Sequence, residues 1–520
     1  MNPRCNVKLD PAAIEWAIKS LNKHGDTDLF PKPVELMALA ADLIASVKEI
    51  GNLDISQHLP GAPRRFIVPK DDLSYRAATQ LDPLDSIILT AVLKQFGPGI
   101  EARRIAVADK KVFSYRFGPT ADLEMYKSRG AWNDFWQHCL KLCQQYKYVL
   151  YVDIADFYNQ VYHHTVENQL IESGLPNQAS KWILRVLENV SAKVSRGVPV
   201  GPYPAHLLAE ATLIPVDNSL TSRGITFARF VDDIAIFTNN EMTARTCHYQ
   251  VAEILDKQQR LHLQKGKTRI VSAAEFAAHC GKMIADRPIN DLEKQLLAVI
   301  QKYAKGDPYK TISVADLSEE DFKSISTEAV EKILGDYLAS AVPDYVRLRW
   351  FLRRMAQMGH PAGIEFCIRN FDRLIPAVSD VCHYFASVGA GGAKIDWLRV
   401  GDGLVALLDN ALIQSNEYFQ ISILSLFSRE RQLDHTARLL ELFRLSSPYL
   451  RRKIVLAAEA AGMADWLREL KEEVKSMDPW TRRAYLYSTH LLPSEERKFF
   501  LKFVESDSPL EKLIVGWAKK

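Results

Sequence analysis

Phe230-Val231-Asp232-Asp233 places two adjacent carboxylates between two runs of β-branched and aromatic residues, Ile225–Val231 and Ile234–Thr238. Residues of these kinds favour strands, and a short polar break between two strands is typical of a β-hairpin. The sequence therefore predicts a hairpin that carries two acids at its tip.

An earlier strand-like run, Tyr146–Ile154, ends close to two more acids, Asp153 and Asp156. Metal-dependent phosphoryl transfer needs carboxylates from separate strands, because two Mg²⁺ ions lie only about 4 Å apart in such sites. We predict that Asp153 and Asp232 bridge the metal ions, with Asp233 as an auxiliary acid. The expected ion is Mg²⁺, with Mn²⁺ as an alternative. Either stretch alone is as well explained by a capped turn or a solvated hairpin tip, but the two together favour the metal site.

Two further stretches complete an ordered series. The four stretches are, along the chain, Asp153–Tyr158, Gly197–Pro202, Phe230–Asp233 and Leu263–Thr268. This series resembles motifs A to D in the palm of reverse transcriptases. The resemblance implies an α+β fold with reverse transcriptase-like fingers and palm, and a nucleotidyltransferase that extends DNA by two-metal catalysis.

Tyr158 follows Asp153 at the point where the chain leaves the predicted strand. In reverse transcriptases the matching aromatic ring excludes the ribose 2′-hydroxyl, so the resemblance implies that Tyr158 selects deoxynucleotides. The alternative is a core aromatic residue that packs beside Phe157 and Tyr162.

The loop Gly197–Pro202 can bring bare backbone close to a ligand, because glycine has no side chain and proline fixes the turn. Its place between the two acid motifs favours contact with a nucleotide or template, and Gly201 is the predicted substrate-binding residue. On its own, such a stretch is more often an ordinary loop before a helix.

Three basic residues match positions that contact the triphosphate in reverse transcriptases. Lys70 and Arg76 match a lysine and an arginine in the fingers of reverse transcriptases. Lys267 matches the motif D lysine that orients or protonates pyrophosphate. Ammonium and guanidinium groups both suit phosphate oxygens. Four other arginines fit either phosphate contacts or a solvated surface: Arg64, Arg65, Arg103 and Arg104.

Composition sets wide bounds. The chain has 520 residues, of which 47% are hydrophobic and 25% charged, and its net charge of +3 is too small to indicate a nucleic-acid partner by itself. No apolar run approaches the roughly 20 residues of a membrane span, and the first residues show no apolar signal region. We therefore expect no membrane association and a cytoplasmic location.

Changes in hydrophobic periodicity along the chain predict four regions: a helical lead-in (1–59), fingers (60–144), a palm (145–290) and an all-α, HEAT-like region (291–520). Within the fingers, Arg64–Lys70 and Arg103–Val107 are the clearest predicted strands, and Asp85–Phe96 is a predicted helix. Beyond residue 291, proline-separated segments with helical periodicity favour stacked helix pairs over an irregular bundle.

More specific strings narrow the resemblance. Asp153–His164, Gly201–Glu210, and Ser114–Phe117 with the long helical end resemble the bacterial abortive-infection (Abi) polymerases of the prophage-encoded type. This resemblance implies an antiphage protein that joins deoxynucleotides without a template, primed by a protein hydroxyl and usually a tyrosine. It also implies a single-stranded DNA product attached covalently to the protein, and a closed homo-oligomer, a trimer or hexamer.

Two alternatives stay open at this stage. One is conventional RNA-templated DNA synthesis, as in other reverse transcriptases. The other is a catalytically idle protein that keeps the fold to bind nucleic acid. The joint presence of Asp153, Asp232, Asp233, Lys70 and Arg76 favours an active enzyme over the second alternative.

Overall fold

The computed structural model describes residues 7–127, 130–284, 291–304, 312, 316–339, 342–506 and 508–520. These residues form two compact units. The first contains residues 1–28, 39–65 and 79–287, and the second contains residues 29–38, 66–78 and 288–520. The predicted palm boundary at residue 290 falls on residues 285–290, which lie outside the described residues, and the four-region division stays a prediction.

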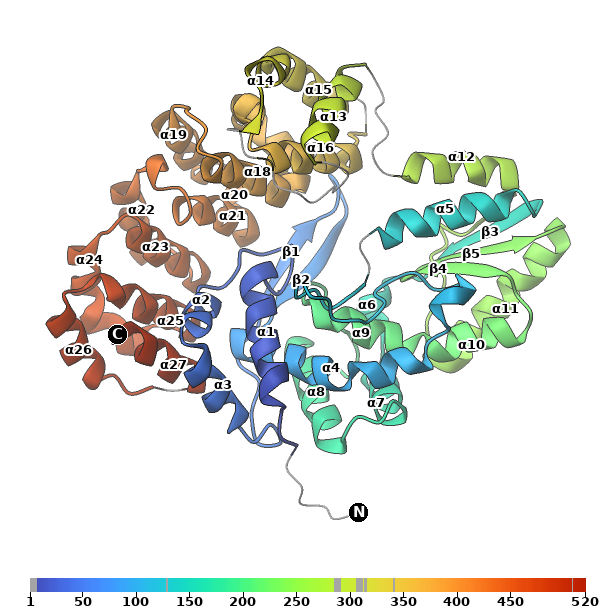
Figure 1. Cartoon of the computed structure of the whole chain (residues 1–520), viewed down its shortest axis with the longest axis horizontal. Helices are drawn as coiled ribbons and strands as arrows, with labels where there is room; N and C mark the ends of the chain where they lie inside the picture. Colours follow the sequence, from blue (N-terminus) through green and yellow to red (C-terminus); the bar gives the residue numbers. More distant parts are fainter. Residues whose placement is uncertain are drawn as a thin grey trace. The chain divides into compact units, whose positions relative to one another are not determined.

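The first unit is built on a four-stranded antiparallel sheet with the order β4-β5-β3-β6. Its strands are β3 (Tyr148–Asp153), β4 (Phe227–Phe230), β5 (Asp233–Thr238) and β6 (Arg269–Ser272). The helices of this unit are drawn in Figure 1: α1 (Pro11–His24), α3 (Leu43–Gly51), α4 (Pro83–Arg103), α5 (Ala131–Cys143), α6 (Phe157–Gln160), α7 (His163–Glu172), α8 (Asn177–Val190), α9 (Tyr203–Thr212), α10 (Ile214–Ser222), α11 (Glu241–Gln259) and α12 (Ala273–Met283).

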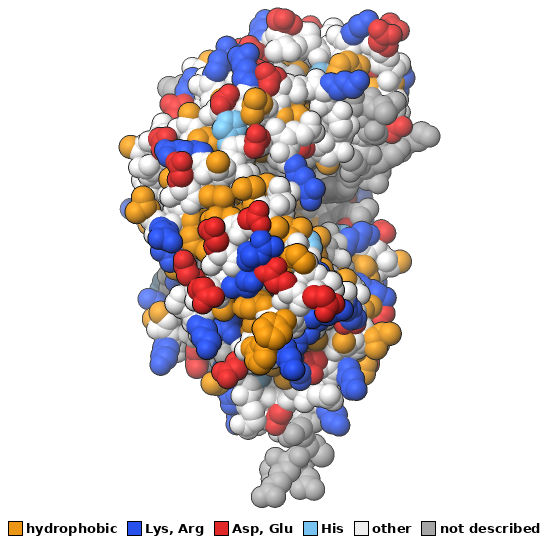
Figure 2. All heavy atoms as spheres, turned by 90° about the vertical axis from the view of Figure 1, so that its left-hand side faces the viewer, with side chains coloured by type: hydrophobic (Ala, Val, Ile, Leu, Met, Phe, Trp, Pro, Cys, Tyr) orange, Lys and Arg blue, Asp and Glu red, His pale blue; other side chains and the backbone are white. Residues whose placement is uncertain are grey.

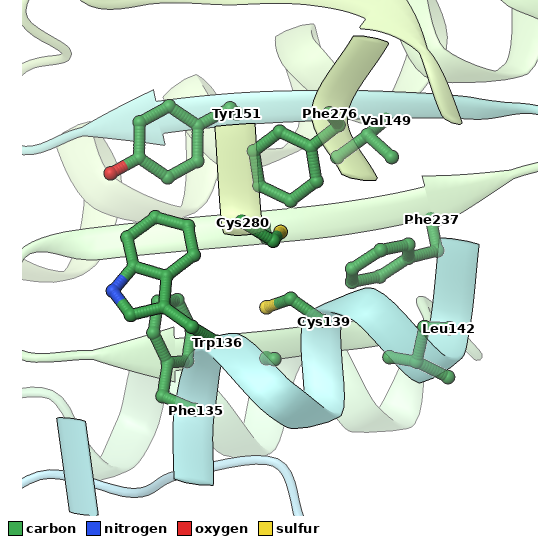
Figure 3. Close-up of a cluster of buried hydrophobic side chains, with 11 residues drawn as sticks. Phe135, Trp136, Cys139, Leu142, Val149, Tyr151, Phe237, Phe276 and Cys280 are labelled. Carbon is green, nitrogen blue, oxygen red and sulfur yellow. The ribbon is translucent and has the colours of Figure 1, made fainter. Parts of the chain in front are cut away.

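Both faces of this sheet are covered by helices, which explains why the central strands β3 and β5 are apolar between their ends. Val149 and Tyr151 face the helices α5 and α12, where Trp136, Phe276 and Cys280 complete a buried cluster (Figure 3). The alternate side chains of β3 point to the other face, where α11 packs on β3 and β5. The sheet therefore holds its strand ends in fixed positions.

The predicted strand Arg103–Val107 is wrong. Arg103 is the last residue of α4, and a short 3-10 turn at Val107–Asp109 follows it. The run looks β-prone because it contains the β-branched residues Ile105 and Val107, but the Arg104 side chain is buried in an ion-pair cluster with Glu210. The predicted helix Asp85–Phe96 is present within the longer α4, which Asp82 caps through a hydrogen bond from the Leu84 amide.

A separate two-stranded sheet joins β1 (Arg64–Pro69) to β2 (Tyr75–Gln80), so the predicted strand at Arg64–Lys70 is confirmed. Residues 66–78, which include most of both strands and the connection between them, belong to the second unit. There the Ile67 carbonyl accepts a hydrogen bond from Asn416 at 2.9 Å, and the Asp72 carboxylate accepts one from the Tyr345 hydroxyl at 2.5 Å.

The described residues beyond 291 contain helices and no strand, which confirms a helical C-terminal region. The α-helices are α13 (Asp291–Ala304), α14 (Glu319–Ser324), α15 (Thr327–Ala339), α16 (Tyr345–Met358), α17 (Ile364–Arg369), α18 (Val378–Ala390), α19 (Trp397–Leu408), α20 (Ala411–Gln414), α21 (Glu417–Phe427), α22 (Thr436–Leu442), α23 (Pro448–Ala460), α24 (Ala464–Glu469), α25 (Pro479–Ser488), α26 (Ser494–Lys502) and α27 (Pro509–Ala518). The helices α16, α18, α21, α23, α25 and α27 pack one on the next in that order. This succession suits a stacked array, and its HEAT-like character stays a prediction.

An N-terminal segment completes the second unit. Glu35 begins α2 (Glu35–Ala41) and is fully buried. Its carboxylate accepts two hydrogen bonds from Arg452, at 3.0 and 2.7 Å, and one from Arg483 at 3.1 Å. Both guanidinium groups also lie over the Trp480 ring, at 5.1 and 4.9 Å from its centre. The helical region is therefore fastened to a segment more than 400 residues earlier in the chain.

One face of the molecule shows a mixed charge distribution. On the face drawn in Figure 2, lysine and arginine side chains are interspersed with aspartate and glutamate, and no patch of one sign dominates. Of the helices in the described ranges, none is both long enough and apolar enough to cross a membrane.

Candidate active site

Three acids meet at one end of the sheet of the first unit. Asp153 is the last residue of β3 and lies opposite Asp233, the first residue of β5, in the antiparallel register. Asp232 occupies the turn between β4 and β5. The predicted hairpin with two acids at its tip is therefore present, and the pairing of β3 with β5 brings Asp153 beside it.

The turn between β4 and β5 has only two residues, because Phe230 pairs with Asp233. Val231, its first residue, has a left-handed backbone with φ of 55°. The Asp232 carbonyl accepts a hydrogen bond from the Ile154 amide at 3.0 Å. The two acid-bearing segments are thus joined directly through their backbones.

The electrostatics of this site suit a cation. Burial, and then the neighbouring carboxylates of Asp233 and Asp153, raise the pKa of Asp232 to about 7. Burial also raises the pKa of Asp233, and Asp153 adds to the rise. Carboxylates crowded into a partly buried site repel each other, and a nearby positive charge would relieve that repulsion. The acids therefore fit the oxygen-rich environment that Mg²⁺ prefers.

Two of the three acids are held by neighbouring side chains. The Lys267 ammonium lies 2.6 Å from Asp153 Oδ2, and the Tyr151 hydroxyl donates to Asp233 Oδ1 at 2.5 Å. Among the described residues, no group of three or more His, Cys, Asp or Glu side chains is arranged to hold a metal ion. The donor chemistry fits Mg²⁺, which the carboxylates of Asp153, Asp232 and Asp233 would hold.

Lys267 reaches Asp153 from a turn that is itself tied to β3. The Gln264 amide donates to the Asp153 carbonyl at 2.7 Å, and the Lys267 amide donates to the Gln264 carbonyl at 3.1 Å. Partial burial opposes protonation of Lys267, but its hydrogen bond and ion pair with Asp153 raise its pKa. The lysine is thus held as a cation beside the acids, and its role toward pyrophosphate stays a prediction.

Tyr158 lies on the short helix α6, and its hydroxyl is 2.6 Å from Nδ1 of His206 on α9. The His206 ring stacks on Tyr115, with ring centres 4.0 Å apart and planes 4° from parallel. Tyr115 and Tyr158 remain partly exposed. Burial above all, and then nearby groups that include Glu210 and Asp232, raise the pKa of both hydroxyls. The structure therefore places an aromatic group beside the acids, while the sugar-selecting role of Tyr158 stays a prediction.

Sequence reasoning did not assign a role to His206. Its only local signal is a position three residues after Tyr203 on the helix that follows the glycine-containing loop. Its contact with Tyr158 spans 48 residues, and its contact with Tyr115 spans a still longer separation. No short pattern in the chain reveals such contacts.

Gly201 has a structural reason to be glycine. Its φ is 129°, and a Cβ atom added there would lie 2.6 Å from the Thr79 carbonyl oxygen. The adjacent Val200 carbonyl accepts a hydrogen bond from the Thr79 amide at 2.7 Å. The close approach that the sequence suggested is thus to the backbone of β2, and substrate binding by Gly201 stays a prediction.

Lys70 and Arg76 belong to the second unit. The Lys70 side chain is exposed, and its carbonyl accepts a hydrogen bond from Arg349 at 2.5 Å. Arg76 is half-buried. Burial lowers the pKa of the Arg349 guanidinium, and the positive charge of Arg76 lowers it further. Binding of a triphosphate by Lys70 and Arg76 stays a prediction.

Comparison with known proteins supports the assignment of the fold. Residues 68–311 match the family model described as reverse transcriptase (RNA-dependent DNA polymerase). No curated protein matches the chain. Among solved structures, apo telomerase from Candida tropicalis is similar over 86% of this chain and 69% of that chain, with 9% sequence identity and a TM-score of 0.30. The family match alone assigns a reverse transcriptase-like domain, the fold of nucleotidyltransferases, to a range that includes all three acids.

Proposed function

We propose, from the premise that residues 68–311 form a reverse transcriptase-like domain, that this chain is a Mg²⁺-dependent DNA polymerase of bacterial antiphage defence. The observation that carries the proposal is the meeting of Asp153, Asp232 and Asp233 across β3 and β5. Acids from separate strands are what two-metal nucleotidyl transfer requires.

When bound, the metal ions would supply charge neutralisation at the reacting phosphate. Asp153 and Asp232 would hold them, and Asp233 would support the site while its Oδ1 accepts a hydrogen bond from Tyr151. Lys267, released from Asp153, would hold a proton next to the leaving pyrophosphate. Tyr158, oriented by His206, would exclude a ribose 2′-hydroxyl.

The finer proposal rests on the resemblance to abortive-infection polymerases. Under it, the chain joins deoxynucleotides without a template and begins on a protein hydroxyl. Its product is single-stranded DNA attached to the protein, and it works as a cytoplasmic homo-oligomer. The motifs at Asp153–His164 and Gly201–Glu210 support this resemblance.

The decisive experiment incubates the full chain with labelled deoxynucleotides and Mg²⁺, without primer or template. We expect label that stays with the protein under denaturation and that disappears in Asp232→Ala. A matched control is Asp134→Ala, which removes an exposed acid from α5 of the same unit. Incorporation only after a primed RNA is added would instead establish templated synthesis, and incorporation that survives in Asp232→Ala would overturn the mechanism.

The biological part of the proposal has its own test. Cells that express the wild-type chain should plate a panel of phages less efficiently than cells that express Asp232→Ala at equal levels. Light scattering on the purified chain should give the mass of a trimer or a hexamer. Equal plating with both chains on every phage would refute the defence role, and a monomer mass would refute the assembly.

A further inference from the structure

The residue that precedes the paired acids is strained. Val231 is 7% exposed and β-branched, and its φ of 55° is a conformation that such residues rarely adopt. Strain of this kind persists only where the surrounding structure imposes it, and it is concentrated at functional sites.

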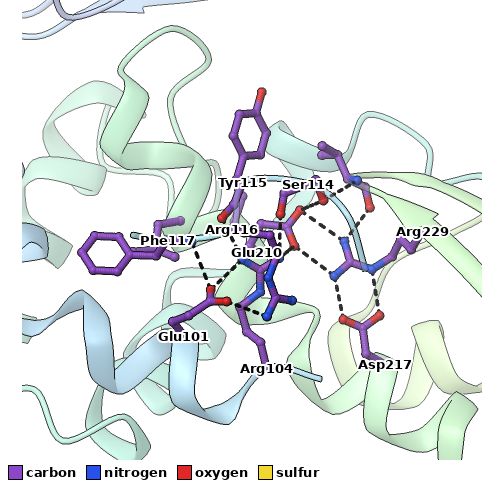
Figure 4. Close-up of polar contacts among 12 residues, drawn as sticks. Glu101, Arg104, Ser114, Tyr115, Arg116, Phe117, Glu210, Asp217 and Arg229 are labelled. Atoms are coloured by element: carbon purple, nitrogen blue, oxygen red, sulfur yellow. Dashed lines mark hydrogen bonds and ion pairs between the residues drawn. The ribbon is translucent and has the colours of Figure 1, made fainter. Parts of the chain in front are cut away.

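Buried side chains hold both backbone groups of Val231. Its amide donates to the Ser114 hydroxyl oxygen at 2.9 Å, and its carbonyl accepts from Arg229 Nη1 at 2.9 Å. Ser114 and Arg229 are both 0% exposed. Figure 4 shows that Ser114 and Arg229 come from different segments and that both lie close to Glu210.

Every N–H donor of the Arg229 guanidinium group is engaged in a hydrogen bond. A guanidinium group has five N–H donors, and Arg229 makes five hydrogen bonds: two to Asp217, two to Glu210 and one to Val231. The Asp217 contacts are short, at 2.7 and 2.6 Å. With every other donor engaged, the group has no freedom to leave the Val231 carbonyl.

Glu210 links Ser114 to Arg229. It accepts from the Ser114 hydroxyl at 2.5 Å and from Arg104 Nη2 at 2.7 Å, in addition to its bonds with Arg229. Arg104 also donates to the carbonyl of Tyr115 at 2.7 Å, and Tyr115 is a second left-handed residue with φ of 42°. The cluster thus contacts two left-handed backbone positions, Tyr115 and Val231.

Stability alone does not account for this cluster. A buried ion network is often no more stable than apolar residues of the same volume, because the desolvation of its charges offsets their attraction. What an ionic network adds is direction, since each hydrogen bond fixes an atom in one place. Here two of those bonds end on the backbone of the turn that carries Asp232 and Asp233.

We propose that Arg104, Ser114, Glu210, Asp217 and Arg229 form a turn clamp, a set of positioning residues that holds Val231 in its left-handed conformation and thereby aims Asp232 and Asp233. The catalytic consequence rests on the proposed function. The conformational part does not, because it concerns only the fold of this turn.

The first test is Ser114→Ala, which removes the acceptor of the Val231 amide and leaves the acids untouched. We expect kcat for nucleotide incorporation to fall by about 10- to 100-fold with KM nearly unchanged, because small misplacements of reacting groups cost that much. The matched control is Ser180→Ala on α8, a serine at 0% exposure whose hydroxyl has no hydrogen-bond partner among the described residues. An unchanged kcat in Ser114→Ala would overturn the proposal.

The second test asks whether the clamp acts through the conformation of Val231. Glycine adopts positive φ without strain, so Val231→Gly should make the clamp dispensable. In the Val231→Gly background, Ser114→Ala should reduce kcat by less than about threefold. Val231→Asn, which also tolerates a left-handed backbone, provides a second background. An equal loss from Ser114→Ala in all three backgrounds would show that Ser114 acts elsewhere.

Thermal unfolding separates this proposal from the proposed function. Ser114→Ala should lower the unfolding midpoint of the wild-type chain more than that of Val231→Gly, whether or not the protein incorporates nucleotides. A wild-type chain without activity but with this unequal shift would refute the function and support the clamp. Equal shifts in an active enzyme would refute the clamp and leave the function standing.

Discussion

Each of the two units contains a buried ion network, and the two networks end on different targets. In the first unit, Arg229 and Glu210 lead to the backbone of a strained turn beside the acids. In the second unit, Arg452 and Arg483 converge on the side chain of Glu35. Similar buried chemistry thus orients a few atoms in one unit and fastens a distant segment in the other. We therefore expect damage to the first network to reduce activity as well as stability, and damage to the second to reduce chiefly stability.

The largest expected effect concerns the acids that the first network serves. Asp232→Ala should reduce incorporation by about 1,000-fold or more, since loss of a bridging metal ligand removes several kcal/mol of transition-state stabilisation. Its unfolding midpoint should equal or exceed that of the wild type, because the substitution removes one of several mutually repelling carboxylates. Incorporation assays and thermal unfolding on the same preparation check both parts. A large fall in the stability of Asp232→Ala would contradict this distinction between the acids and the buried networks.

The second network gives the largest expected change in stability. Glu35→Ala leaves the guanidinium groups of Arg452 and Arg483 buried without their carboxylate, which typically costs about 3–5 kcal/mol. The measurement is the free energy of unfolding in urea. The matched control is Glu365→Ala, because Glu365 forms an exposed ion pair with Arg399 and should cost at most about 1 kcal/mol. Similar losses in the two variants would show that Glu35 does not fasten its segment.

The same carboxylate predicts a dependence of stability on pH. Burial opposes ionisation of Glu35, but Arg452 and Arg483 prevail and lower its pKa from 4.5 to about 2. A lowered folded-state pKa gives stability that is fully present above pH 4.5 and is lost as the pH falls toward 2. The loss should amount to about 3 kcal/mol.

Urea unfolding at several pH values between 2 and 6 measures this effect, and the difference between the wild type and Glu35→Gln isolates it from other carboxylates. Glu35→Gln should be less stable than the wild type at pH 6, and the gap should narrow as the pH falls. A constant gap across this range would contradict the predicted ionisation of Glu35.

The contrast between the networks also explains what the sequence could reveal. The hairpin at Phe230–Asp233 and the strand that ends at Asp153 follow from local composition, so their pairing and the meeting of the acids could be anticipated. The helical character of the second unit likewise follows from periodicity within each segment. These features depend on neighbours along the chain.

The networks could not be found this way, because each joins residues far apart in the sequence. Glu210 and Arg104 are 106 residues apart, and Glu35 and Arg452 are 417 apart. The wrong strand at Arg103–Val107 has the same origin: Ile105 and Val107 are of β-prone types, whereas Arg104 is paired with the distant Glu210. A charged residue gives no sequence signal that it is buried when its partner lies in another segment.

The smallest expected effect concerns Tyr158, whose hydroxyl contacts His206 and not a residue of either network. Tyr158→Ala should increase incorporation of ribonucleotides relative to deoxynucleotides by about 10-fold or more, since it removes a ring that would collide with a 2′-hydroxyl. Tyr158→Phe keeps the ring and loses only the bond to His206, so it should retain most of the discrimination. Competition between matched ribo- and deoxynucleotides measures the ratio. If Tyr158→Ala keeps the wild-type ratio, the ring packs against His206 and Phe157 for structural reasons alone, and sugar selection lies with another residue.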